Sequence, residues 1–430
     1  MGGKYRFRHL VYYGTMQQIL LQIIGKRCCA INEIRAGRKY DGPEVRIRWR
    51  LTAAAMLVLI FILAAAVMLY LKVSGERMND SYVEITDPIE RALVPFWDGK
   101  TMYDETLLMV ADGEGRPAAK LLFKPDRIVS VTNSVQDIRY EEGVDWIYED
   151  GLLQVPEGSR IAVLKKSQLY PATHLPGMDF PRKGGGNVLY REGSFFHENQ
   201  INVTYTHDTS QWQGSVPKFA GQTLPRTIGK LRAGQPLRLV LFGDSIAEGQ
   251  NTSGKIGAAP YLPTWGELLA NKLRKAYCSD IDFSNLSVGG KDSAWGKAEA
   301  AKRVAAHRLD LVIIAFGMND GTLDVSPEVF RENIRDIMDT VRHTNPESEF
   351  ILVSPSLPNP ETDFYKRQAD YKPALDSLAL KGIAVADMTG IHQELLLHKS
   401  FVDMTGNNIN HPNDFLIRWY AQYLIGMLVS

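Results

Sequence analysis

The sequence predicts an α/β domain in its C-terminal half, a parallel sheet with helices on both faces. An all-β, sandwich-like domain and a single transmembrane helix are predicted to precede it. Residues 51–71 carry no charge, residues 78–225 alternate short β-branched runs with turns, and apolar and helical patterns alternate from residue 237 onward. A chain of 430 residues has room for two or three domains, and its three cysteines are too few for a disulfide framework.

The N-terminal fifty residues are basic, with eleven Lys/Arg and three Asp/Glu, although the whole chain has a formal net charge of zero. We interpret residues 1–50 as a cytoplasmic segment and residues 51–72 as a transmembrane signal anchor. The uncharged stretch would span roughly 31 Å as a helix, close to the thickness of a bilayer core. The preceding positive charges predict a cytoplasmic N-terminus and extracellular C-terminal domains. A cleaved signal peptide is the alternative, although its apolar region is normally shorter. No nucleic-acid partner is indicated.

Residues 78–225 are predicted to form the sandwich-like domain. Short runs such as 201–205 are separated by turn pairs such as Asp150-Gly151. Two roles stay open for this domain: a spacer beside the membrane, or a carbohydrate-binding module that uses exposed aromatic side chains. The aromatic candidates are Trp97, Trp146 and Trp212. Residues 226–236 are interpreted as a linker.

Residues 237–430 alternate strands and helices. Thr264 and Glu267 predict a capping box at one helix start, and Pro327 occupies the first position of another. The expected strands are 237–241, 281–286, 309–316, 350–353 and 383–385, and the expected helices begin near residues 264, 293, 326, 365 and 412.

Four polar segments follow strand ends or precede the last helix. They contain Ser245, the run 285–290, Asn319 and His411. Each segment taken alone is equally well read as a turn or a loop. Open α/β sheets place their ligands at the carboxyl ends of the strands, so the four together predict a site there.

These four blocks resemble those of the SGNH hydrolase family, the GDSL esterases and lipases, over about residues 237–430. The resemblance implies a flavodoxin-like parallel sheet and a serine hydrolase without metal or cofactor. It assigns Ser245 as the nucleophile and His411 as the general base. Gly290, preferred to Gly289 by the family spacing, and Asn319 would join the Ser245 N–H as the oxyanion hole. The chemistry is consistent: a serine hydroxyl needs a base, and uncharged N–H donors stabilise the tetrahedral oxyanion.

One position departs from the family pattern. The aspartate expected three residues before the histidine is Asn408 here. An amide cannot offset the charge of an imidazolium, so the third member of the triad is open. Asp414 or Asp403 would supply the carboxylate, a Ser–His dyad would rely on a carbonyl group, or the domain has degenerated.

The predicted function is that of a membrane-anchored extracellular serine esterase that forms an acyl-enzyme on Ser245. Its expected substrates are small acyl esters, in particular acetyl groups on a small-molecule or polysaccharide carbohydrate. The alternative is a non-catalytic cell-surface glycan-binding protein with a degenerate SGNH domain. Within the enzyme class, lipase, thioesterase and O-acyltransferase activities stay open.

Overall fold

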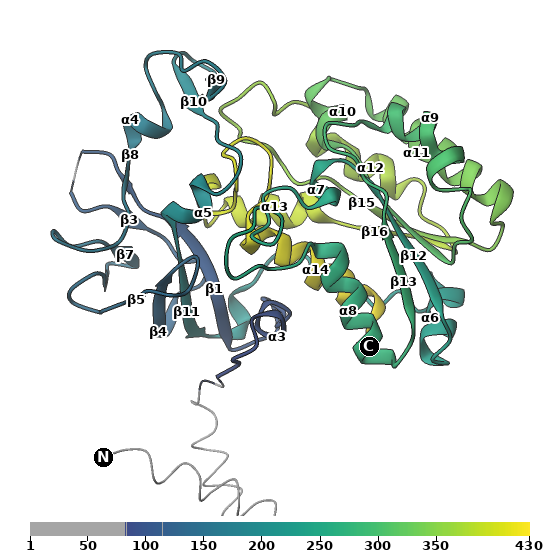
Figure 1. Ribbon diagram of the computed structural model, residues 1–430, viewed down its shortest axis with the longest axis horizontal. Coiled ribbons are helices and arrows are strands. Elements are labelled where there is room, and N and C mark those ends of the chain that lie inside the picture. The colour runs from purple at the N-terminus through teal and green to yellow at the C-terminus, as the bar shows by residue number, and fades with distance from the viewer. Residues whose placement is uncertain (1–81, 83, 114) are drawn as a thin grey trace, which may run out of the picture. The chain divides into compact units, whose positions relative to one another are not determined.

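The computed structural model describes residues 82–430, except residues 83 and 114 (Figure 1). The predicted cytoplasmic segment, residues 1–50, and the predicted anchor, residues 51–72, lie outside the described residues. Within the described part of the chain, no helix combines the length and the apolar character needed to cross a bilayer.

A five-stranded parallel sheet carries the candidate site (Figure 1). Its strand order is β13-β12-β14-β15-β16, and every neighbouring pair is parallel. This is the flavodoxin-like order, in which the first strand lies between the second and the third, and it confirms the predicted fold class of this part. The strands are β12 (Leu237–Gly243), β13 (Ile281–Asn285), β14 (Leu311–Ala315), β15 (Glu349–Val353) and β16 (Ile383–Ala386).

Helices cover both faces of this sheet because successive side chains of a strand point to opposite sides. Leu239 and Leu241 of β12 join one core cluster, whereas Val240 and Phe242 join the other. The first face is covered by α6 (Pro225–Arg232), α8 (Trp265–Tyr277), α13 (Met388–Leu396) and α14 (Asp414–Leu428). The second face is covered by α9 (Ser293–Arg303), α11 (Pro327–Thr344) and α12 (Tyr371–Asp376). The predicted capping box at Thr264 and Glu267 is present at the start of α8.

The N-terminal part is β-rich, but its sheets are unequal. One antiparallel sheet has the order β1-β11-β4-β5, and the others have two or three strands, so the described residues do not form two comparable sheets of a sandwich. The large sheet contains β1 (Thr101–Leu108), β4 (Pro125–Asn133), β5 (Arg139–Tyr140) and β11 (Gln200–His207). The small sheets contain β2 (Val110–Ala111), β3 (Ala118–Ala119), β6 (Ile147–Glu149), β7 (Leu152–Gln154), β8 (Leu164–Lys165), β9 (Asp179–Pro181) and β10 (Asn187–Leu189). The short helices are α3 (Pro88–Ala92), α4 (Lys166–Leu169) and α5 (Phe195–Asn199).

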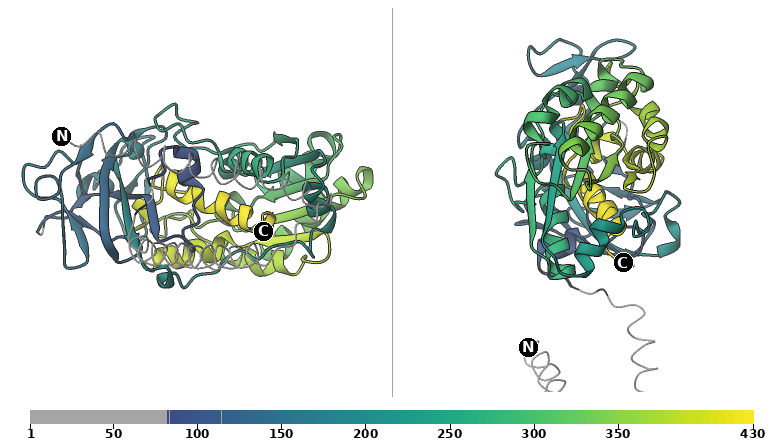
Figure 2. Two further views of the ribbon diagram at one scale, coloured as in Figure 1. Left: turned by 90° about the horizontal axis from the view of Figure 1, so that it is seen from below. Right: turned by 90° about the vertical axis from the view of Figure 1, so that its right-hand side faces the viewer.

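The β-rich part and the α/β part belong to one compact unit, residues 82–430. Figure 2 shows α14, in yellow, between the β-rich strands and the rest of the α/β part. Arg418 of α14 donates hydrogen bonds to the carbonyl oxygens of Tyr103 (2.7 Å) and Asp104 (3.0 Å) of β1. Most of the stretch 226–236, predicted as a linker, is instead helix α6, whose apolar side chains Ile228 and Leu231 are buried in the core.

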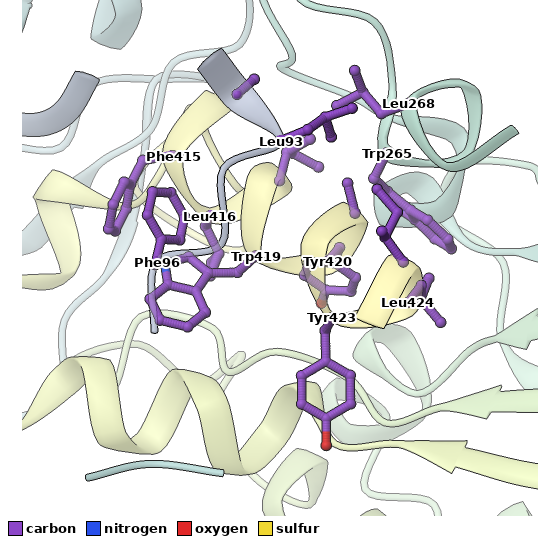
Figure 3. Close-up of a cluster of buried hydrophobic side chains, with 14 of the residues drawn as sticks. Leu93, Phe96, Trp265, Leu268, Phe415, Leu416, Trp419, Tyr420, Tyr423 and Leu424 are labelled. Atoms are coloured by element: carbon purple, nitrogen blue, oxygen red, sulfur yellow. The ribbon is translucent and has the colours of Figure 1, made fainter. Parts of the chain in front are cut away.

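Aromatic and leucine side chains pack together at this contact and in the adjoining core of the α/β part (Figure 3). Trp419 of α14 lies 4.8 Å from Phe96, between ring centroids, and Trp265 of α8 stacks on Tyr420 at 5.7 Å. Two of the proposed carbohydrate-binding aromatics, Trp97 and Trp212, also lie against Trp419, and the third, Trp146, is buried. Trp146 is therefore a core residue, and the partly exposed Trp97 and Trp212 pack against α14.

Candidate active site

Ser245 stands where β12 turns sharply into the short helix α7 (Ser245–Glu248). A Cβ on Gly243 would lie 2.1 Å from the carbonyl oxygen of Ala315, so only glycine permits this close approach of β12 to β14. Asp244 caps the helix by accepting a hydrogen bond from the N–H of Ile246 at 2.9 Å. The turn fixes the serine hydroxyl at the carboxyl edge of the sheet, as the sequence predicts.

His411 reaches Ser245 from a loop that precedes α14. Its Nε2 lies 3.0 Å from the Oγ of Ser245. The loop is shaped by Asn407, whose Oδ1 accepts the backbone N–H groups of Ile409, Asn410 and His411 at 2.9–3.0 Å. The structure thus brings together the predicted nucleophile and the predicted base, 166 residues apart in the sequence.

The other ring nitrogen of His411 faces two acceptors. Nδ1 lies 2.7 Å from Oδ1 of Asn251 and 3.2 Å from Oε1 of Glu192. The amide of Asn251 is oriented by its Nδ2, which donates to the carbonyl oxygens of Gly193 and Gly406. Because both neighbours accept, Nδ1 carries the proton and the lone pair of Nε2 faces the serine hydroxyl. This tautomer is the one that a general base requires.

Sequence reasoning missed both Asn251 and Glu192. Its alternative of a Ser–His dyad oriented by a carbonyl group agrees with the contact to Oδ1 of Asn251, whereas its named candidates for a third member make their recorded contacts elsewhere. Asp414 accepts the backbone N–H of Ser253 at 2.8 Å, and Asp403 accepts that of Leu108 at 2.8 Å. Asn408 donates its Nδ2 to the carbonyl oxygen of Leu189 at 3.0 Å. The three candidates were chosen because they lie near His411 in sequence, but their side chains are already used in holding neighbouring segments.

The predicted oxyanion hole lies beside Ser245. Gly289 donates its N–H to Oε2 of Glu248 at 2.8 Å, so its amide is already engaged. Gly290 follows with φ +73° and lines the same cavity as Ser245, which favours Gly290 as the oxyanion donor. Asn319 donates one amide hydrogen to the carbonyl oxygen of Lys291 at 2.8 Å, and this bond orients the side chain whose second hydrogen is available to a substrate.

Two buried carboxyl groups support these loops without touching His411. Burial raises the pKa of Asp244 to about 7 and that of Asp320 to about 6. Asp320, next to Asn319, accepts the backbone N–H of Ser293 at 3.0 Å and also the hydroxyl of Ser293, which fixes the start of α9. Both groups therefore hold the framework of the site.

The site opens into a cavity of about 600 Å³, within the range typical of small-molecule sites. The β-rich part contributes one wall, in which Phe180 and Tyr190 lie 5.0 Å apart, and Phe364 of the α/β part lies 4.8 Å from Phe180. The cavity is lined by Phe180, Tyr190, Glu192, Gly193, Ser245, Gln250, Asn251, Lys255, Ile256, Gly289, Gly290, Asn319, Phe364, Ile409, Asn410 and His411. Among the described residues, no group of three or more His, Cys, Asp or Glu has an arrangement suited to a metal ion.

A doubly covered parallel sheet with a Ser–His pair at its carboxyl edge is an arrangement that serine hydrolases use. A family model described as the GDSL-like Lipase/Acylhydrolase family matches residues 241–415. This region of the chain is thus similar to a family of lipases and acylhydrolases.

Curated relatives are distant. An arylesterase of Vibrio mimicus is 27% identical over 105 residues, which cover 24% of this chain and 48% of the relative. The Thioesterase 1/protease 1/lysophospholipase L1 of Escherichia coli strain K12 is 24% identical over 197 residues, 45% of this chain and 86% of the relative. The chain thus spans about half the length of the first of these proteins.

Solved structures are similarly distant. A two-domain esterase active on acetylated mannans gives a TM-score of 0.40 at 20% identity and covers 49% of this chain and 53% of that one. The acetylxylan esterase Axe2 of Geobacillus stearothermophilus gives a TM-score of 0.37 at 18% identity, and the match covers 44% of this chain and 92% of that one.

Proposed function

We propose that this protein hydrolyses small acyl esters through an acyl-enzyme on Ser245. The observation that carries the proposal is the 3.0 Å contact between Nε2 of His411 and Oγ of Ser245, inside a cavity that Gly290 and Asn319 also line. A Ser–His pair with preoriented hydrogen-bond donors is the machinery of acyl transfer.

The mechanism follows from this geometry. His411 takes the proton of the Ser245 hydroxyl as the oxygen attacks the ester carbonyl carbon. The N–H groups of Ser245 and Gly290 and the amide of Asn319 receive the developing oxyanion. His411 then returns the proton to the leaving alcohol, and water releases the acyl group by the same steps in reverse.

The proposed substrates are acetyl esters of carbohydrate. The cavity combines the aromatic rings of Phe180, Tyr190 and Phe364 with the amides of Gln250 and Asn410. Aromatic faces suit the C–H surface of a sugar ring, and amides suit its hydroxyl groups.

We further propose that residues 51–71 anchor the chain in a membrane, with the N-terminus in the cytoplasm and the active site outside. The support is the uncharged stretch and the basic residues that precede it in the sequence. Proteolysis of intact cells, which should digest the C-terminal part from outside, tests this orientation.

The activity is tested with the full-length protein in detergent. We expect it to hydrolyse p-nitrophenyl acetate and to react with a fluorophosphonate probe. The variant Ser245→Ala should lose the labelling and reduce the rate by at least about 10³-fold, because the nucleophile is gone. Equal rates for the two proteins would exclude a mechanism that uses Ser245 as nucleophile. If the wild type is active, release of acetate from acetylated xylan tests the substrate class.

A further inference from the structure

We propose that Glu192, a residue of the β-rich part, is the carboxylate that lies beside His411 and offsets its charge during catalysis. It would thus take the role of the aspartate that Asn408 replaces. The inference rests on the proposed esterase function, which it deepens by making the β-rich part a contributor to the catalytic centre.

The geometry divides the usual task of a triad acid between two side chains. Oδ1 of Asn251 is the closer acceptor of the Nδ1–H of His411, at 2.7 Å, and Oε1 of Glu192 lies at 3.2 Å. A neutral amide fixes the orientation and the tautomer of the ring. Only the carboxylate can compensate the positive charge that appears on the imidazole when it takes the proton of Ser245.

Glu192 is held in its place by two further donors. Its Oε1 accepts hydrogen bonds from Nδ2 of Asn407 and from the hydroxyl of Tyr190, both at 2.9 Å. Burial by itself would raise the pKa of Glu192, but the hydrogen bond and charge of His411, together with the bonds from Asn407 and Tyr190, lower it to about 2. The pKa of Glu192 thus lies below its usual range, which favours the carboxylate form beside His411.

The backbone that carries Glu192 is bound to the loop that carries His411. Arg191 donates its N–H to the carbonyl oxygen of Asn407 at 3.4 Å, and Nδ2 of Asn408 donates to that of Leu189 at 3.0 Å. An aspartate at position 408 has no hydrogen to donate. The departure from the family pattern and the presence of Glu192 therefore have one explanation: the amide holds the segment that brings a substitute carboxylate.

Few other charged groups face His411 among the described residues. Asp244 is buried behind Ser245 and caps α7, and Lys255 lines the cavity. Asp414 is turned toward Ser253. Glu192 is the carboxylate for which the structure records a contact with Nδ1.

The test compares full-length Glu192→Gln with the wild type. Glutamine preserves the shape and an acceptor oxygen but removes the charge, and 41% of the Glu192 side chain is exposed, so folding should be retained. We expect kcat/KM on p-nitrophenyl acetate to fall about 10- to 100-fold, the loss expected for a charge-assisted hydrogen bond. The loss should lie in kcat, with KM little changed, and Glu192→Asp should recover part of it. The acid limb of the pH profile should move to lower pH, because the imidazolium has lost a compensating charge.

The matched control is Glu198→Gln, six residues further along, where the carboxylate accepts a hydrogen bond from Ser194 outside the cavity. It should keep the wild-type rate and pH profile. An unchanged kcat and acid limb in Glu192→Gln would overturn the inference while leaving the esterase function intact. If the wild type shows neither hydrolysis nor fluorophosphonate labelling, the proposed function fails and this inference fails with it, whereas an active wild type with an unchanged Glu192→Gln variant overturns this inference alone.

Discussion

Asn408 occupies the position three residues before His411, and its side chain holds two neighbouring segments. Its Nδ2 holds Leu189, and its Oδ1 lies 3.3 Å from Nδ2 of Asn359. The residue is fully buried and has a left-handed backbone with φ +66°, which asparagine tolerates better than most residues. Position 408 is therefore specified by its structural contacts and by the conformation of its loop.

Restoring the family residue with Asn408→Asp should impair the protein rather than improve it. The new carboxylate would face the carbonyl oxygen of Leu189 and lose the hydrogen bond that holds the Glu192 segment. We expect a destabilisation of at least about 1–3 kcal/mol and a lower kcat, measured by urea unfolding and ester hydrolysis. The exposed exchange Asn271→Asp on α8 serves as control and should change neither quantity. A rise in kcat in Asn408→Asp would contradict our account of this position.

Helix α13 carries a buried histidine that makes stability depend on pH. Nδ1 of His392 accepts the backbone N–H of Leu357 at 2.9 Å, and its Nε2 is buried without a partner among the described residues. Burial lowers the pKa of His392 to about 3. Between about pH 6.5 and pH 3, His392 is therefore protonated in the unfolded chain but not in the folded chain. Acidification through this range lowers the free energy of unfolding.

The variant His392→Asn should weaken this dependence, because asparagine offers Leu357 an acceptor but does not titrate. Urea unfolding from pH 7 to pH 4.5 should show that the wild type loses up to about 1.4 kcal/mol per pH unit more than the variant below pH 6.5. Buried acids with a raised pKa, such as Asp244 and Asp320, make the folded state more stable as the pH falls. They are present in both proteins, so their contribution cancels when the two pH dependences are compared. Parallel curves would mean that His392 does not titrate as its burial implies.

At the scale of the described unit, a buried ion pair joins the β-rich part to the α/β part. Lys399, which follows α13, pairs with Glu105 of β1, and both side chains are fully buried. Glu105 also accepts the hydroxyl of Tyr205 at 2.5 Å and the N–H of Leu122 at 2.8 Å. Removing one ion of such a pair leaves an uncompensated charge in the interior.

Lys399→Met should therefore destabilise the protein by about 3–5 kcal/mol in urea unfolding. Since the pair joins the β-rich part to the α/β part, we expect both parts of the variant to unfold in one transition, at a lower urea concentration than in the wild type. The control is Lys275→Met, which removes an exposed pair with Glu90 at 2.5 Å and should leave the stability nearly unchanged. Separate transitions of the two parts would show that the contact does not couple them.

The parallel sheet was predictable from the sequence, and so were most of its helices and the four segments that meet at Ser245. These features depend on local patterns: apolar runs for buried strands, the capping box at Thr264, and the spacing of blocks that resemble a known family. The sequence also favoured Gly290 over Gly289, a choice that the hydrogen bond from Gly289 to Glu248 supports. Helix α6 was missed because Pro225 was read as the start of a linker, although proline also suits a first helical position.

The side chains that contact Nδ1 of His411 could not be predicted from the sequence. Glu192 and Asn251 lie far from it in sequence, in segments with no pattern of their own that marks a site. Their roles arise when the β-rich part and the α/β part pack together and their backbone groups pair across the contact. Local patterns reflect the preferences of neighbouring residues, whereas a charge placed 3.2 Å from a histidine depends on the packing of the whole unit.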